Sequence, residues 1–380
     1  MSKVNIQFLA VIAMIGALSQ GPCFANGPNL KYVIESEVSY VDSCVTTSGA
    51  IVEGPKDLTT FRGTPHYKIC PYFSNFAAYA LLEDPTGSNV KVVKNWMKWV
   101  FNHLNPDGSI YDYYVDRLSG GTDLPSVDAY PLEKIPNFDS QDSYAATFLT
   151  LVRKYAEVMP GDISWLKSHS KELKLIGKAL DATINYKTHK ANHFSPNNHD
   201  GLSVAKLHYQ AKYTMDNSEV NEGLKDMVWL EKNLITDGDP SFYKKLLKKN
   251  DAGFANLWDP AASAYYVYEG DVAPKWNTFY PDAECQLWPI LCGVITPTSA
   301  RATAIYDTFN SHFKNWQNGD PSVAPLGYIA ALMKDRIRAN TYLEYVQGLL
   351  EKGLDSRLGN VADAAWIIRA AEMIRRGSSN

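Results

Sequence analysis

The chain has 380 residues, of which 45% are hydrophobic, and this is enough for the core of one large globular domain. Its formal net charge of -4 is spread without long runs of like charge, which excludes nucleic acid or an anionic membrane surface as the main partner. Aromatic residues make up 12% of the chain, including 23 Tyr and 9 Trp. We expect most of them in the core, while exposed ones can stack on sugar rings.

The first 25 residues have the pattern of a secretory signal peptide. Lys3 precedes an apolar run at residues 8–18, and small residues lead to Ala25. The run is too short to span a bilayer, so we expect cleavage after Ala25 and a secreted or periplasmic protein that does not insert into the membrane. Cys23 leaves lipid attachment as an alternative, although its sequence context is poor for that modification.

Four cysteines remain after removal of the signal peptide, namely Cys44, Cys70, Cys285 and Cys292. An even number in an oxidising compartment indicates two disulfides, for which three pairings exist. We favour Cys44 with Cys70 and Cys285 with Cys292. No Cys-x-x-Cys spacing is present, so a metal site at these cysteines is not expected.

The rest of the chain, residues 26–380, alternates apolar with amphipathic helical segments. An extended start at residues 32–40 and a loop at 46–64 precede an apolar helix near residues 70–82 and an amphipathic one at 90–104. Short strands are expected at 109–115 and 264–270. The helical pair then recurs at residues 143–158 and 163–186, 218–234 and 242–257, 283–295 and 299–316, and 323–333 and 340–350, with a last apolar helix at 360–374.

Six apolar helices, five of them followed by an amphipathic helix, predict an all-α fold in which an outer ring surrounds an inner ring. No linker indicates a second domain. We therefore expect one domain built from six helical hairpins, with short β-strands in the loops at its rim.

Three apolar helices start with the same layout, in which an aromatic residue and acids precede the buried run, at residues 138–155, 213–234 and 280–295. Acids at a helix start accept hydrogen bonds from unpaired N–H groups, so helix capping is the simplest interpretation, above all for Asp139. Repetition of the layout favours a site instead. Carboxylates on the first turns of neighbouring inner helices converge at the mouth of the ring; they are Asp142, Asp216, Glu219, Asp282 and Glu284.

The six-hairpin pattern resembles the (α/α)6 toroid of the six-hairpin glycosidase superfamily over essentially the whole mature chain. Residues 141–149, Gln-Asp-Ser-Tyr-Ala-Ala-Thr-Phe-Leu, are similar to the Asp-led inner-helix start of family 8 glycoside hydrolases, a distant similarity. The turn Trp258-Asp259-Pro260, followed by an aromatic strand, is common in such toroids. The resemblance implies an exported glycoside hydrolase that acts on a polysaccharide or oligosaccharide.

Glycoside hydrolysis needs one protonated and one ionised carboxyl group, about 6.5–9.5 Å apart for inversion and about 5–5.5 Å for retention. Packed helices lie roughly 8–10 Å apart, which favours inversion. We expect Asp142 to be ionised, as a base or a sugar-binding group, with Asp216 or Glu219 as its counterpart and Asp282 as the next candidate. The further substrate-binding candidates are Tyr72, Asp139, Tyr144, Glu222, Trp258, Trp276 and Glu284.

No cofactor or metal is expected. His189, His193, His199 and His208 match no zinc-ligand spacing and read as part of a polar loop. Trp288, midway along an apolar helix, is expected in the core. We expect a monomer that binds carbohydrate and no nucleic acid.

Two other classes of function stay open. A polysaccharide lyase or a sugar epimerase on the same toroid would use Tyr, His or Arg as catalytic groups, and Arg62 and His66 before the first inner helix keep the lyase open. A non-catalytic glycan-binding toroid would have dispersed acids and an open aromatic face. Fold alone does not separate these alternatives.

Overall fold

The computed structural model describes residues 27–126, 138–186, 200–319, 323–353 and 359–378. The predicted signal peptide and three of the four loop histidines, His189, His193 and His199, lie outside the described residues. None of the helices in the described ranges is long and apolar enough to cross a membrane.

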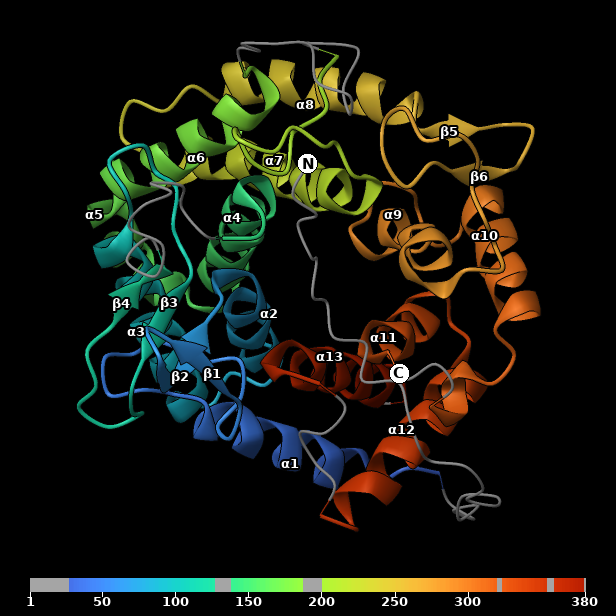
Figure 1. Ribbon diagram of the computed structural model, residues 1–380, viewed down its shortest axis with the longest axis horizontal. Helices are drawn as coiled ribbons and strands as arrows, with labels where there is room; N and C mark the ends of the chain where they lie inside the picture. Colours follow the sequence, from blue (N-terminus) through green and yellow to red (C-terminus); the bar gives the residue numbers. More distant parts are fainter. Residues whose placement is uncertain (1–26, 127–137, 187–199, 320–322, 354–358, 379–380) are drawn as a thin grey trace.

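Six helical elements form a closed inner ring (Figure 1). Each packs against the next along the chain, and the last returns to the first. The predicted inner ring is therefore confirmed. Its members are α2 (Pro71–Leu81), α4 (Gln141–Val158), α7 (Thr214–Asn233), α9 (Trp288–Leu291), α11 (Ala324–Leu332) and α13 (Val361–Ser378).

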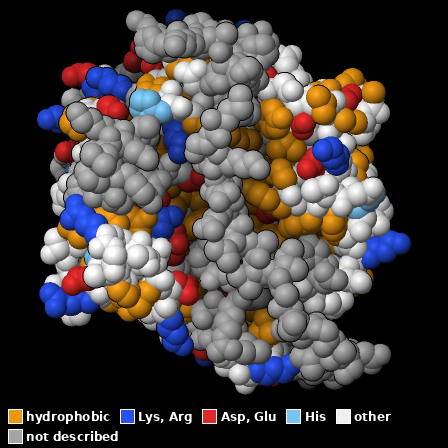
Figure 2. All heavy atoms as spheres, in the orientation of Figure 1, with side chains coloured by type: hydrophobic (Ala, Val, Ile, Leu, Met, Phe, Trp, Pro, Cys, Tyr) orange, Lys and Arg blue, Asp and Glu red, His pale blue; other side chains and the backbone are white. Residues whose placement is uncertain are grey.

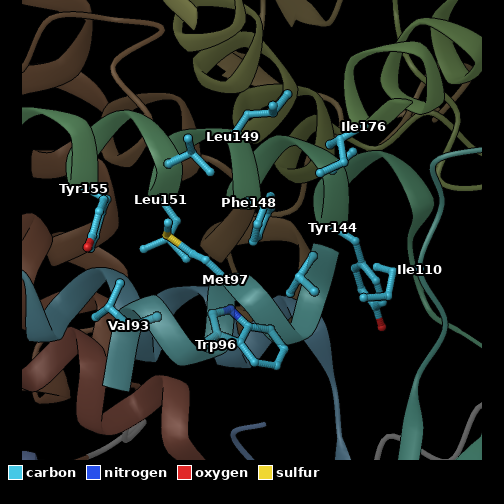
Figure 3. Close-up of a cluster of buried hydrophobic side chains, with 14 of the residues drawn as sticks. Val93, Trp96, Met97, Ile110, Tyr144, Phe148, Leu149, Leu151, Tyr155 and Ile176 are labelled. Atoms are coloured by element: carbon cyan, nitrogen blue, oxygen red, sulfur yellow. The ribbon is translucent and has the colours of Figure 1, made fainter. Parts of the chain in front are cut away.

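Outer helices cover the inner ring from outside (Figure 1). Their sequences bury one stripe and expose lysines on the other side, as in α3, where Val93 and Trp96 are fully buried and Lys91 is exposed. Figure 3 shows Val93, Trp96 and Met97 of α3 facing Phe148 and Leu151 of α4. The outer helices are α3 (Gly87–His103), α5 (Ile163–Ser168), α6 (Ser170–Ile184), α8 (Pro240–Ala255), α10 (Ala300–His312) and α12 (Arg336–Leu350).

The extended start expected at residues 32–40 is wrong, because the segment lies in helix α1 (Leu30–Ser43). The Asn29 side chain accepts a hydrogen bond from the backbone N–H of Tyr32 and caps the helix. Val33 and Val41 are completely buried, and α1 packs on α13 and α12. It is therefore the outer helix of the sixth hairpin, and the first and last described helices close the ring together.

The fourth inner element is less regular than the helix expected at residues 283–295. It consists of the short helix η3 (Phe279–Ala283) and the one-turn α9. Pro281 and Pro289 explain the interruption, because proline has no backbone N–H to donate within a helix. Two 3-10 turns complete the helical elements, η2 (Pro160–Asp162) before α5 and η4 (Trp316–Asn318) after α10.

Short antiparallel strands precede the inner helices. Four of them form a sheet in the order β1-β2-β3-β4, in which Tyr67 of β2 pairs with Val115 of β3. Since β2 leads directly into α2, this sheet lies at the end of the ring where the inner helices begin. The strands expected at residues 109–115 and 264–270 are confirmed in shorter form as β3 and β6. The strands are β1 (Leu58–Phe61), β2 (Thr64–Ile69), β3 (Tyr113–Val115), β4 (Leu124–Pro125), β5 (Trp258–Asp259) and β6 (Ala264–Tyr265).

The two predicted disulfides are not formed. All four cysteines of the described residues are free and buried. The Cys70 thiol lies 3.3 Å from the Tyr144 hydroxyl, and the Cys285 thiol donates a hydrogen bond to the carbonyl oxygen of Asp282. The thiols therefore contribute to packing and hydrogen bonding inside the hairpins.

Replacement of Ile34 by Ala tests the ring closure. Ile34 is buried in α1 within the cluster that includes Ile367 of α13, so Ile34→Ala should lower the free energy of unfolding by about 2–5 kcal/mol. Urea unfolding followed by circular dichroism measures it. The matched control is Lys31→Ala on the exposed side of α1, which should change the free energy of unfolding by less than about 1 kcal/mol. Equal effects of the two variants would contradict the assigned packing of α1.

Candidate active site

Three of the predicted acids, Asp142, Asp216 and Glu219, come together at the start of helices α4 and α7. These two helices pack closely because Gly223 leaves room for the backbone. A Cβ atom at this position would lie 2.7 Å from the Cα atom of Ala146, closer than atoms can pack. The absence of that Cβ brings the acids of one helix toward those of the other.

Asp142 is completely buried and accepts hydrogen bonds at both carboxylate oxygens. Its Oδ1 accepts from the Ser140 hydroxyl at 2.6 Å and from the Ser143 backbone N–H at 2.8 Å, and its Oδ2 accepts from the Ser203 hydroxyl at 2.5 Å. Burial raises the pKa of Asp142 to about 6, while these donors oppose the rise by stabilising the carboxylate. The three donors therefore favour the ionised form of Asp142, and its predicted role as an ionised group stays a prediction.

Glu219 lies one turn into α7 and is 4% exposed. Its Oε1 accepts hydrogen bonds from the Tyr72 hydroxyl at 2.5 Å and from the indole N–H of Trp288 at 3.0 Å. Burial raises the pKa of Glu219 to about 7, with a further contribution from the Asp142 charge. Trp288 is buried, as predicted, and also reaches the site.

Asp216 is partly exposed on the first turn of α7. Burial, and then the charges of Asp142 and Glu219, raise its pKa well above the usual carboxyl range. Like charges at one site cannot all ionise easily, so the most crowded group keeps its proton. Asp216 therefore holds its proton more strongly than Asp142 does.

The other predicted acids lie on different elements. Asp282 is buried in η3, and the charges that influence its pKa are those of Lys275 and Asp271 and not those of the cluster. Burial raises the pKa of Glu284 to about 8, with an added contribution from Asp363 of α13. Glu284 and Asp363 form a second, separate pair of acids.

Tyr280 connects the two groups of acids. Its side chain is 54% exposed, and partial burial together with the charges of Glu284 and Asp216 raises its pKa to about 12. Asp139 contributes to the same effect from an exposed position before α4, where its side chain does not cap the helix. The phenol thus lies among carboxylates from several sides of the ring.

The predicted aromatic residues divide into two groups. Tyr72 and Tyr144 stack at the site with ring centroids 6.4 Å apart. The Tyr144 hydroxyl donates to Asp112 at 2.8 Å, and Asp112 in turn lies 3.3 Å from Lys68, so Tyr144 is fixed in the wall. Tyr72, by contrast, donates its hydroxyl to Glu219 and so contacts the acids directly, as Trp288 does.

Trp258 and Trp276 have their recorded contacts on the outer helix α10. The Arg301 guanidinium carbon lies 4.4 Å from the centre of the Trp258 ring, and the rings of Trp276 and His312 stack with their centres 6.1 Å apart. Arg301 and His312 both belong to the outer helix α10. On the face shown in Figure 2, Lys and Arg side chains lie mostly at the outer edge and hydrophobic side chains are visible closer to the centre. The role of the two Trp residues in sugar binding stays a prediction.

A small cavity of about 20 Å³, room for about one water molecule, lies beside the cluster, and Glu219 and Glu222 both line it. Glu222 was predicted as a substrate-binding residue, and the structure places it one turn deeper than Glu219. The other lining residues come from the inner helices and the segment after α9; they are Asn75, Phe76, Tyr79, Thr147, Thr150, Leu291, Cys292, Trp366 and Arg369.

Several residues of the site were not predicted. Ser203 belongs to a segment that reads as a polar loop, and nothing in the sequence indicates its bond to Asp142. Arg369 and Asp363 lie in the last inner helix, whose apolar sequence predicted only packing. Acid and base residues at inward positions of an otherwise apolar helix were the signal that could have identified them, because charged side chains are rarely buried without a role or a partner.

Arg62 and His66, the two residues that kept a polysaccharide lyase open as an alternative, lie in the β1–β2 hairpin. His66 is 7% exposed in β2, where its Nδ1 contacts Thr64, and Arg62 lies in the exposed turn between β1 and β2. Among the described residues no group of three or more His, Cys, Asp or Glu side chains is arranged to hold a metal ion.

Comparisons with known proteins agree with this fold. No protein-family model and no curated protein matches the chain. A solved structure described as wild-type glycosidase is 13% identical, covers 90% of this chain and 96% of its own, and has a TM-score of 0.58. The chain therefore shares the helical toroid fold of this solved structure.

A second solved structure supports the same conclusion. The GH63 mannosylglycerate hydrolase from Thermus thermophilus, in complex with glucose, is 12% identical with a TM-score of 0.57, and the match covers 90% of this chain and all of that one. In complex with Tris and D-glycerate its TM-score is 0.55. At this identity the likeness establishes the fold, and the distant similarity to family 8 stays a prediction without support from these structures.

The acids inside the ring make stability depend on pH. Burial, and then the charge of Glu222, raise the pKa of Asp226 on α7 to about 8. A raised carboxyl pKa stabilises the folded state fully below about pH 4, and this contribution is lost as the pH rises through about 8. Asp226→Asn should therefore raise the melting temperature at pH 8 and change it little at pH 5.

Differential scanning calorimetry at the two pH values measures this difference. Asp307→Asn, at an exposed position of α10, is the matched control and should leave the pH dependence unchanged. A fall in the melting temperature of Asp226→Asn at pH 8 would contradict the burial of an unfavourable charge at this position.

Proposed function

We propose that the protein is a glycoside hydrolase that acts on a polysaccharide or oligosaccharide. The observation that carries the proposal is the cluster of Asp142, Asp216 and Glu219 on the first turns of α4 and α7, where burial and hydrogen-bond donors raise the pKa values of neighbouring carboxyl groups by different amounts. Glycosidases need that difference, since one carboxyl group donates a proton and another accepts one. The glycosidase toroids with the same fold support the reaction class.

In the proposed reaction Asp216 is the general acid. It transfers its proton to the glycosidic oxygen while the bond from that oxygen to the anomeric carbon breaks. Asp142 is the base and takes a proton from a water molecule whose oxygen bonds to the anomeric carbon. One glycosidic bond and one water are consumed, and two hydroxyl groups are formed.

The placement of these two acids favours inversion. They lie on the first turns of two inner helices in direct contact, and the axes of packed helices are about 8–10 Å apart, which leaves space for water between the carboxyl groups. Proton NMR of the first product should therefore show the anomer opposite to that of the substrate. The same anomer would contradict the assignment of Asp142 as base and favour covalent catalysis.

Export is part of the proposal and rests on the signal-peptide pattern of residues 1–25. A hydrolase of external glycans has its substrate outside the cytoplasm. The lyase alternative is less supported, because His66 and Arg62 lie in the β-hairpin rather than at the acid cluster.

Substitution of the acids tests the hydrolase. Asp216→Asn and Asp142→Asn should each lower kcat by about 10²–10⁴, because each removes a proton-transfer group from the transition state. Reducing-sugar release from a polysaccharide panel measures activity, and absorbance of unsaturated products in the same wells detects a lyase. Asp307→Asn on the outer ring is the control with unchanged kcat. Full activity in the folded Asp216→Asn variant would overturn the assignment.

The pH profile provides a second test. Asp142 has to be ionised to act as base, so kcat/KM should fall as the pH is lowered through about 6, the raised pKa of this group. The profile of Glu219→Gln should keep this acidic limb. If the limb persists in the residual activity of Asp142→Asn, another group is the base.

A further inference from the structure

Of the three donors to Asp142 in the described residues, Ser203 alone comes from outside helix α4 and its start. Ser140 and Ser143 are the residue before α4 and a residue of its first turn, so their bonds to Asp142 are local. Ser203 is fully buried in the segment between α6 and α7, 61 residues further along the chain, and its hydroxyl oxygen lies 2.5 Å from Oδ2 of Asp142. The position of Ser203 at the carboxylate therefore depends on tertiary contacts.

Asn217 of α7 holds the backbone of Ser203 at both of its polar groups. Its Oδ1 accepts a hydrogen bond from the Ser203 N–H at 2.8 Å, and its Nδ2 donates to the Ser203 carbonyl oxygen at 3.1 Å. Asn217 is itself fully buried. The Ser203 hydroxyl has one hydrogen, and its oxygen lies 2.5 Å from Asp142 but 3.2 Å from Oδ1 of Asn217, so Asp142 is the acceptor. The hydroxyl is therefore directed by a backbone that Asn217 fixes.

A second asparagine, Asn250 of the outer helix α8, holds the same segment. Its Nδ2 donates to the carbonyl oxygen of Gly201 at 3.1 Å and lies 3.3 Å from Oδ1 of Asn217, and its Oδ1 accepts from Asn221 at 3.0 Å. Gly201 lets the segment pass close to α8, because its φ is +96° and a Cβ atom there would lie 2.0 Å from the carbonyl oxygen of Lys249. Buried amide groups thus tie the segment to both the inner and the outer ring.

A buried ion network fixes the start of the segment. Lys212 is fully buried, and its Nζ lies 2.7 Å from Asp200 and 3.0 Å from Glu269. Burial alone would lower the pKa of Lys212, but the two carboxylates raise it above its usual value, so the lysine stays charged. Asp200 also accepts from the backbone N–H of Leu202, the residue before Ser203, at 2.9 Å. Since a buried charge is costly to leave unpaired, this network holds Asp200 in place.

The titratable groups on the elements around Asp142 give it no ion pair within the described part of the chain. Those groups are Asp216 and Glu219 of α7, Asp139 before α4, Tyr72 of α2 and Lys206, whose neighbour Ala205 contacts the start of α4. After the larger effect of burial, the Asp142 charge raises the pKa of Asp216 and Glu219, and this coupling acts in both directions. Lys206 donates to the carbonyl oxygen of Phe138. Hydroxyl and N–H donors are therefore what stabilise the carboxylate of Asp142.

The donors also decide which oxygen of Asp142 can take a proton. Among the described residues Oδ1 accepts two hydrogen bonds, from Ser140 and Ser143, whereas Oδ2 accepts one, from Ser203. A carboxylate oxygen has two lone pairs, so those of Oδ1 are both used and Oδ2 keeps one. That lone pair is where a proton from water can be accepted, and Ser203 binds the other lone pair of the same atom.

We propose that Ser203 is a positioning residue for the base: its hydroxyl orients Oδ2 of Asp142 toward the reacting water and stabilises the carboxylate, and Asn217 places that hydroxyl. The action on the carboxylate is independent of any substrate, and only the effect on turnover rests on the proposed hydrolase. Loss of the Ser203 hydroxyl should therefore make Asp142 easier to protonate. Loss of the Asn217 side chain should do so only while the hydroxyl is present.

Carbon-13 NMR titration of the full chain, labelled at the aspartate carboxyl carbons, measures this without a substrate. The signal of Asp142 is the one that Asp142→Asn removes. Ser203→Ala should raise the pKa of Asp142 by about one unit or more, the effect of losing a hydrogen bond to a charged group. Ser74→Ala, at a buried serine of α2 whose hydroxyl bonds to backbone carbonyl oxygens, is the matched control with an unchanged titration. An unchanged pKa of Asp142 in Ser203→Ala would overturn the proposal.

The role of Asn217 is tested in two backgrounds. Asn217→Ala should raise the pKa of Asp142 in the parent protein and add little to the rise already caused by Ser203→Ala, because both changes remove the same interaction. Asn250→Ala changes the same anchor from the outer helix and takes the place of Asn217→Ala if that variant does not fold. Equal rises in the two backgrounds would show that the asparagine acts on Asp142 by another route and would overturn its assigned role.

The pH dependence of turnover separates this inference from the proposed function. In Ser203→Ala the acidic limb of kcat/KM should move to higher pH by the amount that NMR gives, so the loss of kcat/KM should be largest at low pH. A merely structural role would lower kcat/KM by the same factor at every pH, and that result would overturn the positioning role. A raised pKa of Asp142 with an unmoved acidic limb, or without hydrolysis of any substrate, would confirm the action of Ser203 on the carboxylate and overturn Asp142 as the base of a hydrolase.

Discussion

Each inner helix of the ring is enclosed by two neighbouring inner helices and by outer helices, and this enclosure determines the rest of the structure. It requires apolar side chains in nearly every direction, which explains why Ala77, Ala78 and Ala80 of α2 are all fully buried. Small residues allow the close approach of α4 and α7 at Gly223. Polar groups can then face only the axis of the ring, and that is where the acids lie.

The axis concentrates negative charge in a water-poor environment. Burial raises the pKa of Asp142, Glu219 and Asp226 to different values, because their hydrogen-bond donors differ. Asp142 has three donors around it, whereas Asp216 is surrounded mainly by other acids. Protonation therefore varies along α7 and α4 through local contacts, even though all these groups are carboxyls.

Much of the architecture could be predicted from the sequence, because helical periodicity and Pro71 at the start of α2 are local signals. Helix α1 was missed because its Val, Ile and Tyr residues also favour strands, and only packing on α13 decides its form. The acids of α4 and α7 were found because first-turn positions of parallel inner helices must converge. Ser203 and Arg369 were not, because their roles depend on contacts between segments far apart in the chain.

Closure of the ring by α1 also constrains how the protein is made. The backbone N–H of Asn29, which caps α1, donates to the side chain of Gln347 in α12, a separation of 318 residues. During synthesis α1 leaves the ribosome long before α12 and α13, the two helices that cover it. Its apolar side is therefore exposed to solvent until they are made. Contacts of such high sequence separation slow folding, and the apolar side of α1 stays uncovered until α12 and α13 have been made, which is when chaperones protect a chain from aggregation.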